Sequence, residues 1–235
     1  MEIIDFHSHI LPGIDDGSAD TEESLEMLRL EAAQGIGHVV ATPHFYPRHD
    51  NPRRFLERRA QAEKLLLETI GNEGMLPRIS LGAEVYYFSG ISDSEVLSQL
   101  TIDKKRFILL EMPQSPWTDS MYREIEQIWV KQGITPIIAH VDRYISPFRT
   151  HRIPEQLSGL PVLVQANASF FLKTSTRKMA LRMLKNDQIH LLGSDCHNLT
   201  DRRPNLGDAL AVIRKHSGEE AVQQIRNNQT CIFKP

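Results

Sequence analysis

The chain alternates short apolar runs with longer segments of helical periodicity. The apolar runs predict seven strands, at residues 2–6, 38–43, 79–84, 107–111, 136–140, 162–167 and 190–195. Apolar residues near helical spacing predict four intervening helices, at residues 21–34, 53–72, 120–133 and 175–187. Apolar strands that alternate with helices favour a parallel sheet buried on both faces. Seven such strands predict an α/β fold, a distorted (β/α)7 TIM-like barrel with one unit fewer than the familiar eight.

Composition and charge narrow the class of protein. With 235 residues, 40% hydrophobic and 24% charged, the chain fits a single globular domain spanning residues 1–235. A formal net charge of -3 argues against binding to nucleic acid. No apolar run approaches the roughly 20 residues that span a bilayer and no signal peptide is evident, so we expect no membrane insertion. Two cysteines, Cys196 and Cys231, give no disulfide framework and favour a reducing, cytoplasmic location.

Ionisable residues stand at the carboxyl ends of six of the seven predicted strands. They are His7 and His9, then His44, Glu84, Glu111, His140, and finally Asp195 with Cys196 and His197. In a parallel barrel these ends open onto one face, where active sites are built. Any one of these residues, taken singly, could be an ordinary hydrogen-bonded or surface residue. We expect that ordinary role for three other histidines, His38, His190 and His216. Together, at one face, the strand-end residues predict a shared site.

The residue types in this set are those of a metal site. Alternation along a strand puts His7 and His9 on one face, where both rings reach one ion at about 2.0–2.1 Å. Asp15 and Asp16 follow on a glycine-bounded loop; one of them can return as a ligand, and spacing alone does not decide which. Imidazoles and carboxylates without thiolates suit Zn, Mn or Fe. Five histidines and four carboxylates exceed the needs of one ion, so the sequence predicts a catalytic, multinuclear centre.

Charge and nearby arginines indicate the substrate. Three dications among four carboxylates leave a net positive charge, which favours an anion such as phosphate. Ions of this kind lower the pKa of bound water to about 7, which yields hydroxide near neutral pH. Arg143 and Arg202 follow His140 and His197 on the same loop face. Arginine binds phosphate oxygens bidentately, although a surface salt bridge is the alternative for each.

Several motifs together resemble a known family over nearly the whole chain. They are HSH (7–9), TPH (42–44), the glutamates of LGAE and LLEMP, HVDR (140–143) and GSDCHN (193–198). This set resembles the PHP (polymerase and histidinol phosphatase) metal-dependent phosphoesterases. Within that family, FHSHILPGIDDG and DCHNLTDRRP are most similar to bacterial protein-tyrosine phosphatases of the CpsB/YwqE type, which are linked to capsule and exopolysaccharide control. The resemblance implies a (β/α)7 barrel with three divalent metal ions, most commonly Mn2+, with Fe, Zn or Mg as alternatives.

The resemblance also implies a role for each position. His7, His9, Glu84 and Asp195 would hold the first metal. Glu84 would bridge to a second, completed by Glu111 and His140, and a third would be held by Asp16, His44 and His197. Arg143 and Arg202 would bind the phosphoryl group. The implied substrate is phosphotyrosine in the flexible tail of a partner tyrosine kinase.

Residues on the predicted mouth loops leave two interpretations open. Seven aromatic residues lie on these loops: Phe45, Tyr46, Tyr86, Tyr87, Trp117, Phe170 and Phe171. Some of them could flank a phosphotyrosine ring, although packing at the rim is the commoner role for such residues. The basic stretch 48–54 could dock an acidic peptide or simply begin a solvated helix. The tail 218–235 could pack on the barrel or mediate assembly. The sequence does not indicate which oligomeric state the protein adopts.

Four other functions compete with this interpretation. Cys196 and Arg202 fit the C-x5-R loop of cysteine-dependent phosphatases, but the loop lacks glycines and Asp201 would repel phosphate. A small-molecule phosphatase, such as one for histidinol phosphate, would use the same metal site. A nucleic-acid processing module is disfavoured by the mild acidity. A non-enzymatic scaffold that binds a kinase would close its metal coordination, whereas this set leaves room for water and substrate.

Overall fold

The computed structural model describes residues 2–71, 73–145 and 153–233. The last position of the predicted helix 53–72 and the last two residues of the tail lie outside this part of the chain. The strands are β1 (Ile3–Ser8), β2 (Ile36–Ala41), β3 (His44–Phe45), β4 (Arg78–Leu81), β5 (Glu84–Tyr86), β6 (Phe107–Glu111), β7 (Thr135–Ile138), β8 (Leu163–Asn167) and β9 (Leu191–Gly193). The helices are α1 (Thr21–Ala33), α2 (Pro52–Ile70), α3 (Leu97–Leu100), α4 (Asp119–Gln132), α5 (Ile153–Leu157), α6 (Ala168–Leu172), α7 (Thr174–Lys185) and α8 (Leu206–Phe233), with short 3-10 turns η1 (Ile91–Asp93), η2 (Ile102–Lys104) and η3 (Val141–Arg143).

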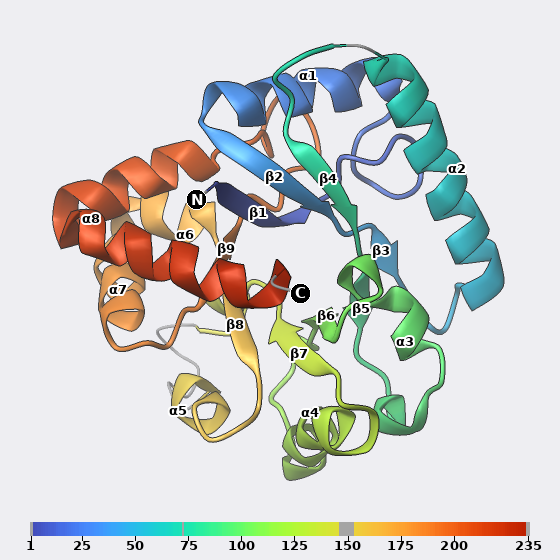
Figure 1. Ribbon diagram of the computed structural model, residues 1–235. Coiled ribbons are helices and arrows are strands. Elements are labelled where there is room, and N and C mark those ends of the chain that lie inside the picture. Colours follow the sequence, from blue (N-terminus) through green and yellow to red (C-terminus); the bar gives the residue numbers. More distant parts are fainter. Residues whose placement is uncertain (1, 72, 146–152, 234–235) are drawn as a thin grey trace.

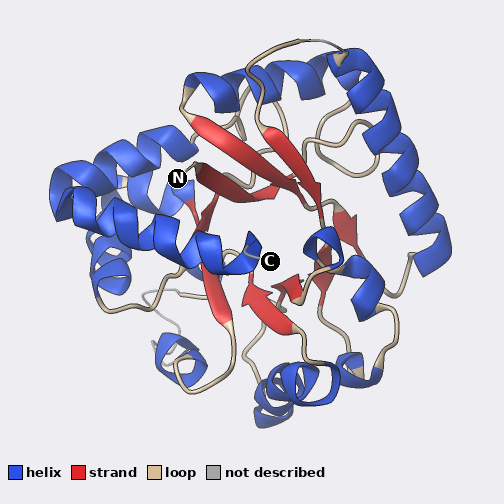
Figure 2. Ribbon diagram, viewed as in Figure 1, coloured by secondary structure: helices blue, strands red, loops and turns tan. Residues whose placement is uncertain are grey.

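The strands form a curled, parallel sheet. Neighbouring strands pair in the orders β1-β2-β4 and β3-β5-β6-β7-β8-β9, and every pairing among the described residues is parallel. The two parts are continuous, because β2 runs into β3 and β4 into β5 after two residues each. A bridge between Ser8 and Cys196 joins β1 to the segment that follows β9. The strands curve around a common centre with helices on the outside (Figure 2), as the alternating pattern predicted.

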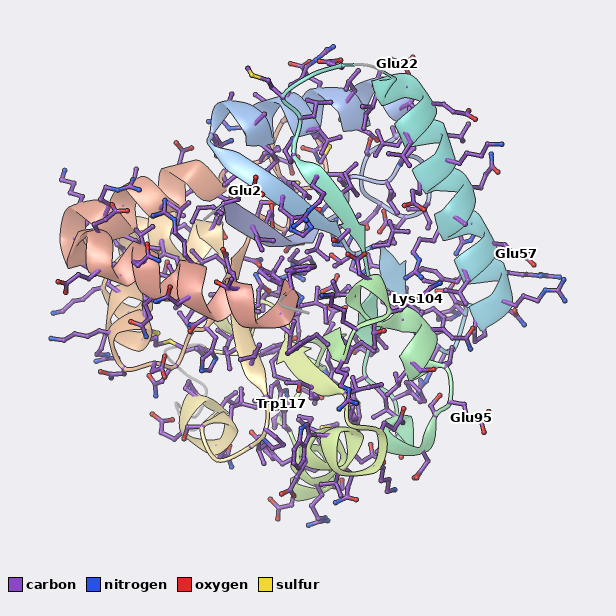
Figure 3. All side chains as sticks on the ribbon, in the orientation of Figure 1. Glu2, Glu22, Glu57, Glu95, Lys104 and Trp117 are labelled. Atoms are coloured by element: carbon purple, nitrogen blue, oxygen red, sulfur yellow. The ribbon has the colours of Figure 1, made fainter. Side chains whose placement is uncertain are left out.

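Local signals set the helix boundaries close to the predicted ones. The Asp20 carboxylate accepts a hydrogen bond from the Glu23 N–H at 2.9 Å and so caps α1. Asn51 caps α2 in the same way, with Pro52 at its first position. Gly133, at a φ of 64°, ends α4. Exposed acidic side chains such as Glu22 and Glu57 lie on the outer sides of α1 and α2 (Figure 3).

Helix α8 closes one end of the curled sheet (Figure 1). Gln229 exchanges two hydrogen bonds with the backbone of Ile4, at 3.1 and 2.9 Å, and the Phe233 ring lies 5.9 Å from that of Phe6. The tail therefore packs on the sheet, which was one of the two options that the sequence left open. Helix α8 was not predicted from the sequence, because Gly218, at a φ of 83°, interrupts its periodicity. No described helix is long and apolar enough to cross a membrane.

Candidate metal centre

The carboxyl ends of the strands bring all nine predicted ligands into one connected cluster. They are His7, His9, Asp16, His44, Glu84, Glu111, His140, Asp195 and His197, and each has a side-chain N or O within 3.6 Å of another member. The members come from positions spread over most of the chain. The fold therefore places residues that are distant in sequence side by side.

Four side chains converge most tightly. The Nε2 atom of His7 lies 3.1 Å from His9 Nε2, 3.2 Å from Glu84 Oε2 and 3.5 Å from Asp195 Oδ1. His9 Nε2 lies 3.4 Å from the same Glu84 oxygen. Donors that bind one ion at about 2.0–2.2 Å are about 2.8–3.6 Å apart at octahedral or tetrahedral angles. The observed separations match those of ligands around one ion.

The other oxygen of Glu84 faces a second group. Glu84 Oε1 lies 2.7 Å from His140 Nε2, and Glu111 Oε1 lies 3.6 Å from the same nitrogen. His44 Nδ1 lies 2.9 Å from Glu84 Oε2. The two oxygens of one buried carboxylate thus point toward different sets of donors, which is the arrangement a bridging ligand needs.

The two neighbouring aspartates have different positions. Asp16 Oδ1 lies 3.4 Å from His44 Nε2 and 3.5 Å from His197 Nε2. The Asp15 carboxylate lies 2.7 Å from His9 Nδ1 and accepts a hydrogen bond from the His44 N–H at 2.9 Å. The geometry therefore favours Asp16 as the residue that faces an ion, with Asp15 holding the His9 ring from behind.

Hydrogen bonds at Nδ1 orient three of the imidazole rings. The Nδ1 atoms of His7, His9 and His197 face acceptors, namely Gln165 Oε1 at 3.3 Å, Asp15 Oδ2 at 2.7 Å and the Asp195 carbonyl at 3.0 Å. A proton on Nδ1 leaves the lone pair on Nε2, which points into the cluster in each case. Metal-binding histidines almost always have such a partner on the far nitrogen.

The cluster contains buried polar atoms that are not hydrogen-bonded. His140 Nδ1 and His197 Nε2 are buried and have no hydrogen-bond partner among the described residues. His44 Nδ1 and Glu84 Oε2 lie 2.9 Å apart but are not aligned for a hydrogen bond. Buried polar atoms are normally paired, so each such atom calls for an explanation. Burial alone would lower the pKa of His7, but the charges of Glu84 and Asp195 raise that pKa above its ordinary value. The donor set and its negative charge therefore fit divalent metal ions.

The backbone is strained at two of the strand ends. His140 and Asp195 have φ angles of 31° and 54°, in the left-handed region that side chains rarely adopt. Gly193, two residues before Asp195, has no room for a side chain, because an added Cβ would lie 2.5 Å from the Cβ of His7. Such strain is typical of functional sites, where the surrounding structure holds a residue in a required position.

The two predicted arginines lie at the mouth of the cluster. Arg143 donates a hydrogen bond to Asp195 Oδ2 at 2.5 Å, and Arg202 donates one to Asp195 Oδ1 at 2.7 Å. The Asp195 side chain is only 4% exposed, whereas the arginines are 31% and 35% exposed. These contacts are therefore not ordinary surface salt bridges. Both guanidinium groups contact a buried member of the cluster while their side chains stay partly open to solvent.

Strand β8 supplies polar residues that the sequence analysis missed. Gln165 Oε1 accepts a hydrogen bond from the His140 N–H at 2.6 Å, besides its contact with His7. Asn167 Nδ2 donates to Asp195 Oδ2 at 2.8 Å. Asp5 of β1 plays a similar part, since its Oδ1 accepts hydrogen bonds from the backbone of His7 and Ser194. The available signal was the presence of polar residues inside otherwise apolar strands.

Replacing Gln165 by Leu should weaken metal binding by about 10–100-fold, because His7 and the His140 backbone lose their shared acceptor. The measurement is a Mn2+ titration of the purified variant followed by electron paramagnetic resonance. Gln229→Leu is the matched control, since Gln229 is equally buried and hydrogen-bonded but lies at the opposite end of the sheet. Equal Mn2+ affinity in the two variants would contradict this role for Gln165.

The buried environment of Cys196 argues against a thiolate nucleophile. Cys196 is fully buried, and burial together with the nearby carboxyl groups of Glu31 and Asp5 raises the pKa of its thiol well above the ordinary value. A nucleophilic cysteine instead needs an accessible, electropositive environment that lowers its pKa. The C-x5-R spacing of Cys196 and Arg202 therefore does not form a phosphate-binding thiolate loop.

Cys196→Ser should retain phosphoester turnover within about threefold of the parent protein, because the thiol does not reach the substrate. Steady-state rates on 4-nitrophenyl phosphate measure this. Treatment of the parent protein with a chelator is the companion experiment and should abolish turnover. An inactive, folded Cys196→Ser variant combined with chelator-resistant activity would reverse the assignment.

The other residues singled out in the sequence lie in ordinary structural positions. His38 and His190 are hydrogen-bonded, to Ser80 at 2.6 Å and to the Val164 N–H at 3.0 Å, and His216 is exposed. Phe170 and Phe171 are buried in the core, and the Phe45 ring packs against Phe55. The Trp117 indole donates to the Pro113 carbonyl. Tyr46, Tyr86, Tyr87 and Trp117 remain at least partly accessible, and Tyr46 stacks on His44 of the cluster.

These features define an α/β protein with a candidate multinuclear metal centre at the carboxyl ends of a curled parallel sheet. The family model described as "Capsular polysaccharide synthesis, CpsB/CapC" matches residues 3–234. The chain belongs to this CpsB/CapC family, in agreement with the resemblance seen in its motifs.

Similar proteins cover nearly the whole chain. The tyrosine-protein phosphatase YwqE of Bacillus subtilis is 29% identical over 251 residues, which is 99% of this chain and 92% of that protein. The tyrosine-protein phosphatase CpsB of Streptococcus agalactiae is 29% identical over 248 residues, 98% of each chain. A solved structure from work on YwqE of B. subtilis and CpsB of Streptococcus pneumoniae, described as unique metal-dependent tyrosine phosphatases, has a TM-score of 0.81 at 25% identity, covering 98% of this chain and 94% of that one.

Proposed function

We propose that this protein is a metal-dependent protein-tyrosine phosphatase. Its substrate is phosphotyrosine on a bacterial tyrosine kinase, in the kinase's flexible tail, and its role lies in capsule or exopolysaccharide biosynthesis. Membership in the CpsB/CapC family and the names of the similar proteins support this proposal. The observation that carries it is the convergence of nine histidine and carboxylate side chains, with two arginines at the mouth of the cluster.

The proposal includes the finer description of the fold and of the centre. Counting β2 with β3 and β4 with β5 as interrupted strands, we take the curled sheet as a (β/α)7 barrel of the PHP type in a single domain. We assign His7, His9, Glu84 and Asp195 to a first ion, Glu84, Glu111 and His140 to a second, and Asp16, His44 and His197 to a third. Mn2+ is the favoured ion, with Fe, Zn or Mg as alternatives.

In this proposal, different residues have different roles in hydrolysis. Divalent ions, when bound, supply a water of lowered pKa and neutralise charge on the phosphoryl oxygens. Arg143 and Arg202 bind the phosphoryl oxygens from the mouth, since each guanidinium has N–H groups beyond the one given to Asp195. Asp15 and Gln165 keep the rings of His9 and His7 oriented.

The leaving group suits a site without a strong general acid. A phenol has a pKa of about 10, so a tyrosine phenolate departs far more easily than an alkoxide. Phosphotyrosine is therefore favoured over alkyl phosphates. A phosphomonoesterase for small molecules, of the histidinol phosphatase kind, remains the alternative because it would use the same ligands.

The cellular setting is also part of the proposal. Cys196 is a free thiol, which suits the reducing cytoplasm where a kinase tail would be met. The sequence pI of about 6.4 gives no support for a nucleic-acid partner.

The test is a comparison of substrates on protein purified without chelator and loaded with Mn2+. Phosphotyrosine peptides, histidinol phosphate and other alkyl phosphomonoesters are assayed in parallel by phosphate release. The proposal expects kcat/KM on phosphotyrosine peptides to exceed that on the alkyl esters by at least about tenfold, and a chelator to remove all activity. A preference for histidinol phosphate would favour the alternative, and activity without metal would refute both.

A further inference from the structure

A cavity of about 450 Å³ adjoins the candidate metal centre. Its walls are mainly aromatic and apolar, and include Tyr46, Tyr86, Tyr87, Phe88, Pro113 and Met121. This volume is within the range of about 300–1,000 Å³ that is typical of ligand pockets, and such pockets are mostly apolar with a few polar groups. None of the nine candidate metal ligands lines this cavity.

The cavity is continuous with the centre through two tyrosines. The Tyr46 ring stacks on His44, with centroids 5.1 Å apart and planes inclined by 26°. The Tyr86 ring lies 5.9 Å from that of Tyr46, and Tyr86 follows Glu84 by two residues on β5. Tyr46 therefore contacts a candidate metal ligand and also lines the cavity.

Hydrogen bonds hold the part of the cavity wall around Tyr87. The Tyr87 hydroxyl donates to Glu124 Oε2 at 2.5 Å, and its backbone N–H donates to the Glu111 carbonyl at 2.8 Å. Glu124 also accepts a hydrogen bond from the Gly90 N–H at 2.7 Å, which ties this segment to α4. A preformed apolar wall costs little entropy when a ligand binds.

The charge at the rim suits an anionic peptide. Arg48 lines the cavity, is exposed and forms no ion pair with any residue that the structure describes. A phosphotyrosine peptide carries negative charge and would be attracted to this side of the mouth.

We propose that this cavity is a peptide subsite, which binds an apolar side chain two residues away from the phosphotyrosine of the substrate. The inference rests on the proposed phosphatase function and names the substrate feature that the site selects. In an extended peptide, side chains two residues apart point to the same side and are about 7 Å apart. With the phosphotyrosine directed into the metal centre, such a neighbour passes the Tyr46 ring and enters the cavity.

Binding tests the subsite without requiring turnover. Peptides with a non-hydrolysable phosphonate analogue of phosphotyrosine, differing only in Leu or Ser two positions before or after it, are titrated with Mn2+-loaded protein by fluorescence anisotropy. The parent protein should bind the better Leu peptide about tenfold more tightly than its Ser counterpart. Tyr86→Ala and, independently, Phe88→Ala should reduce this ratio to about twofold or less.

The matched control is Tyr122→Ala, because Tyr122 is a partly exposed aromatic residue of α4 that does not line the cavity. It should keep the tenfold ratio. Equal affinity for Leu and Ser peptides in the parent protein, or an unchanged ratio in both cavity variants, would overturn the subsite. Turnover of 4-nitrophenyl phosphate is measured separately, so a failure of the phosphatase proposal appears in the turnover rate, whereas a failure of the subsite appears in the binding ratio.

Discussion

Replacement of Glu84 by Gln is expected to lower phosphatase activity by at least about 10³-fold, the largest effect of any single substitution in this protein. Glu84 is 1% exposed, and its two oxygens face different groups of donors, with His7 and His9 near one and His140 near the other. The amide keeps the size of the side chain but removes its charge and one of its two acceptor oxygens. Two of the proposed ions therefore lose a shared ligand in one step.

The measurement is kcat/KM on a phosphotyrosine peptide together with the metal content by mass spectrometry. Glu57→Gln is the control, because Glu57 is exposed on α2 and distant from the cluster. Circular dichroism should show that both variants keep the fold. A Glu84→Gln variant with full metal content and near-normal turnover would show that Glu84 does not bridge ions.

Arg143→Ala should reduce kcat/KM by about 10²–10³-fold while leaving the bound metal unchanged. Arg143 is half-buried at the mouth of the cluster, where its guanidinium contacts Asp195 and lies 3.7 Å from Glu111. Loss of this cation removes a donor that would face the phosphoryl oxygens in the transition state. Lysine supplies the charge without the bidentate geometry, so Arg143→Lys should recover about tenfold at most.

Measuring the metal content of Arg143→Ala distinguishes loss of phosphoryl binding from loss of metal ions, because only the latter lowers the metal content. Arg53→Ala is the control, since Arg53 is an exposed residue of α2 whose ion pair is with Glu57 on its own helix. If Arg143→Ala retained the parent rate, the residue would be a structural partner of Asp195 and no more.

The sequence predicted the alternation of strands and helices well because that pattern follows from local chemistry. Strand 107–111 was predicted with its observed bounds, and the four predicted helices lie within two residues of the observed ones at every described end. The strand predicted at 38–43 ends earlier, at Ala41, because Pro43 interrupts the pairing before His44, although the Thr42 N–H still donates to the Ser8 carbonyl at 2.9 Å. Pro43 has no N–H to donate to a neighbouring strand.

The candidate site was predictable to the extent that it depends on strand ends. Spacing alone did not decide between Asp15 and Asp16, because the choice depends on how the loop folds back over His9, and Asp16 was assigned from the family resemblance. Gln165 and Asn167 were missed because their role arises only when β8 lies beside β7 and β9. The aromatic cavity forms where segments distant in sequence come into contact, and such tertiary contacts leave no periodic pattern in the sequence.

In the proposed centre, imidazoles and carboxylates that are distant in sequence gather around a set of divalent cations. Anomalous X-ray diffraction from crystals of the Mn2+-loaded protein tests this most directly. We predict three peaks, one among His7, His9, Glu84 and Asp195, a second beside Glu111 and His140, and a third among Asp16, His44 and His197. A fully loaded crystal with no peak among these side chains would contradict the account.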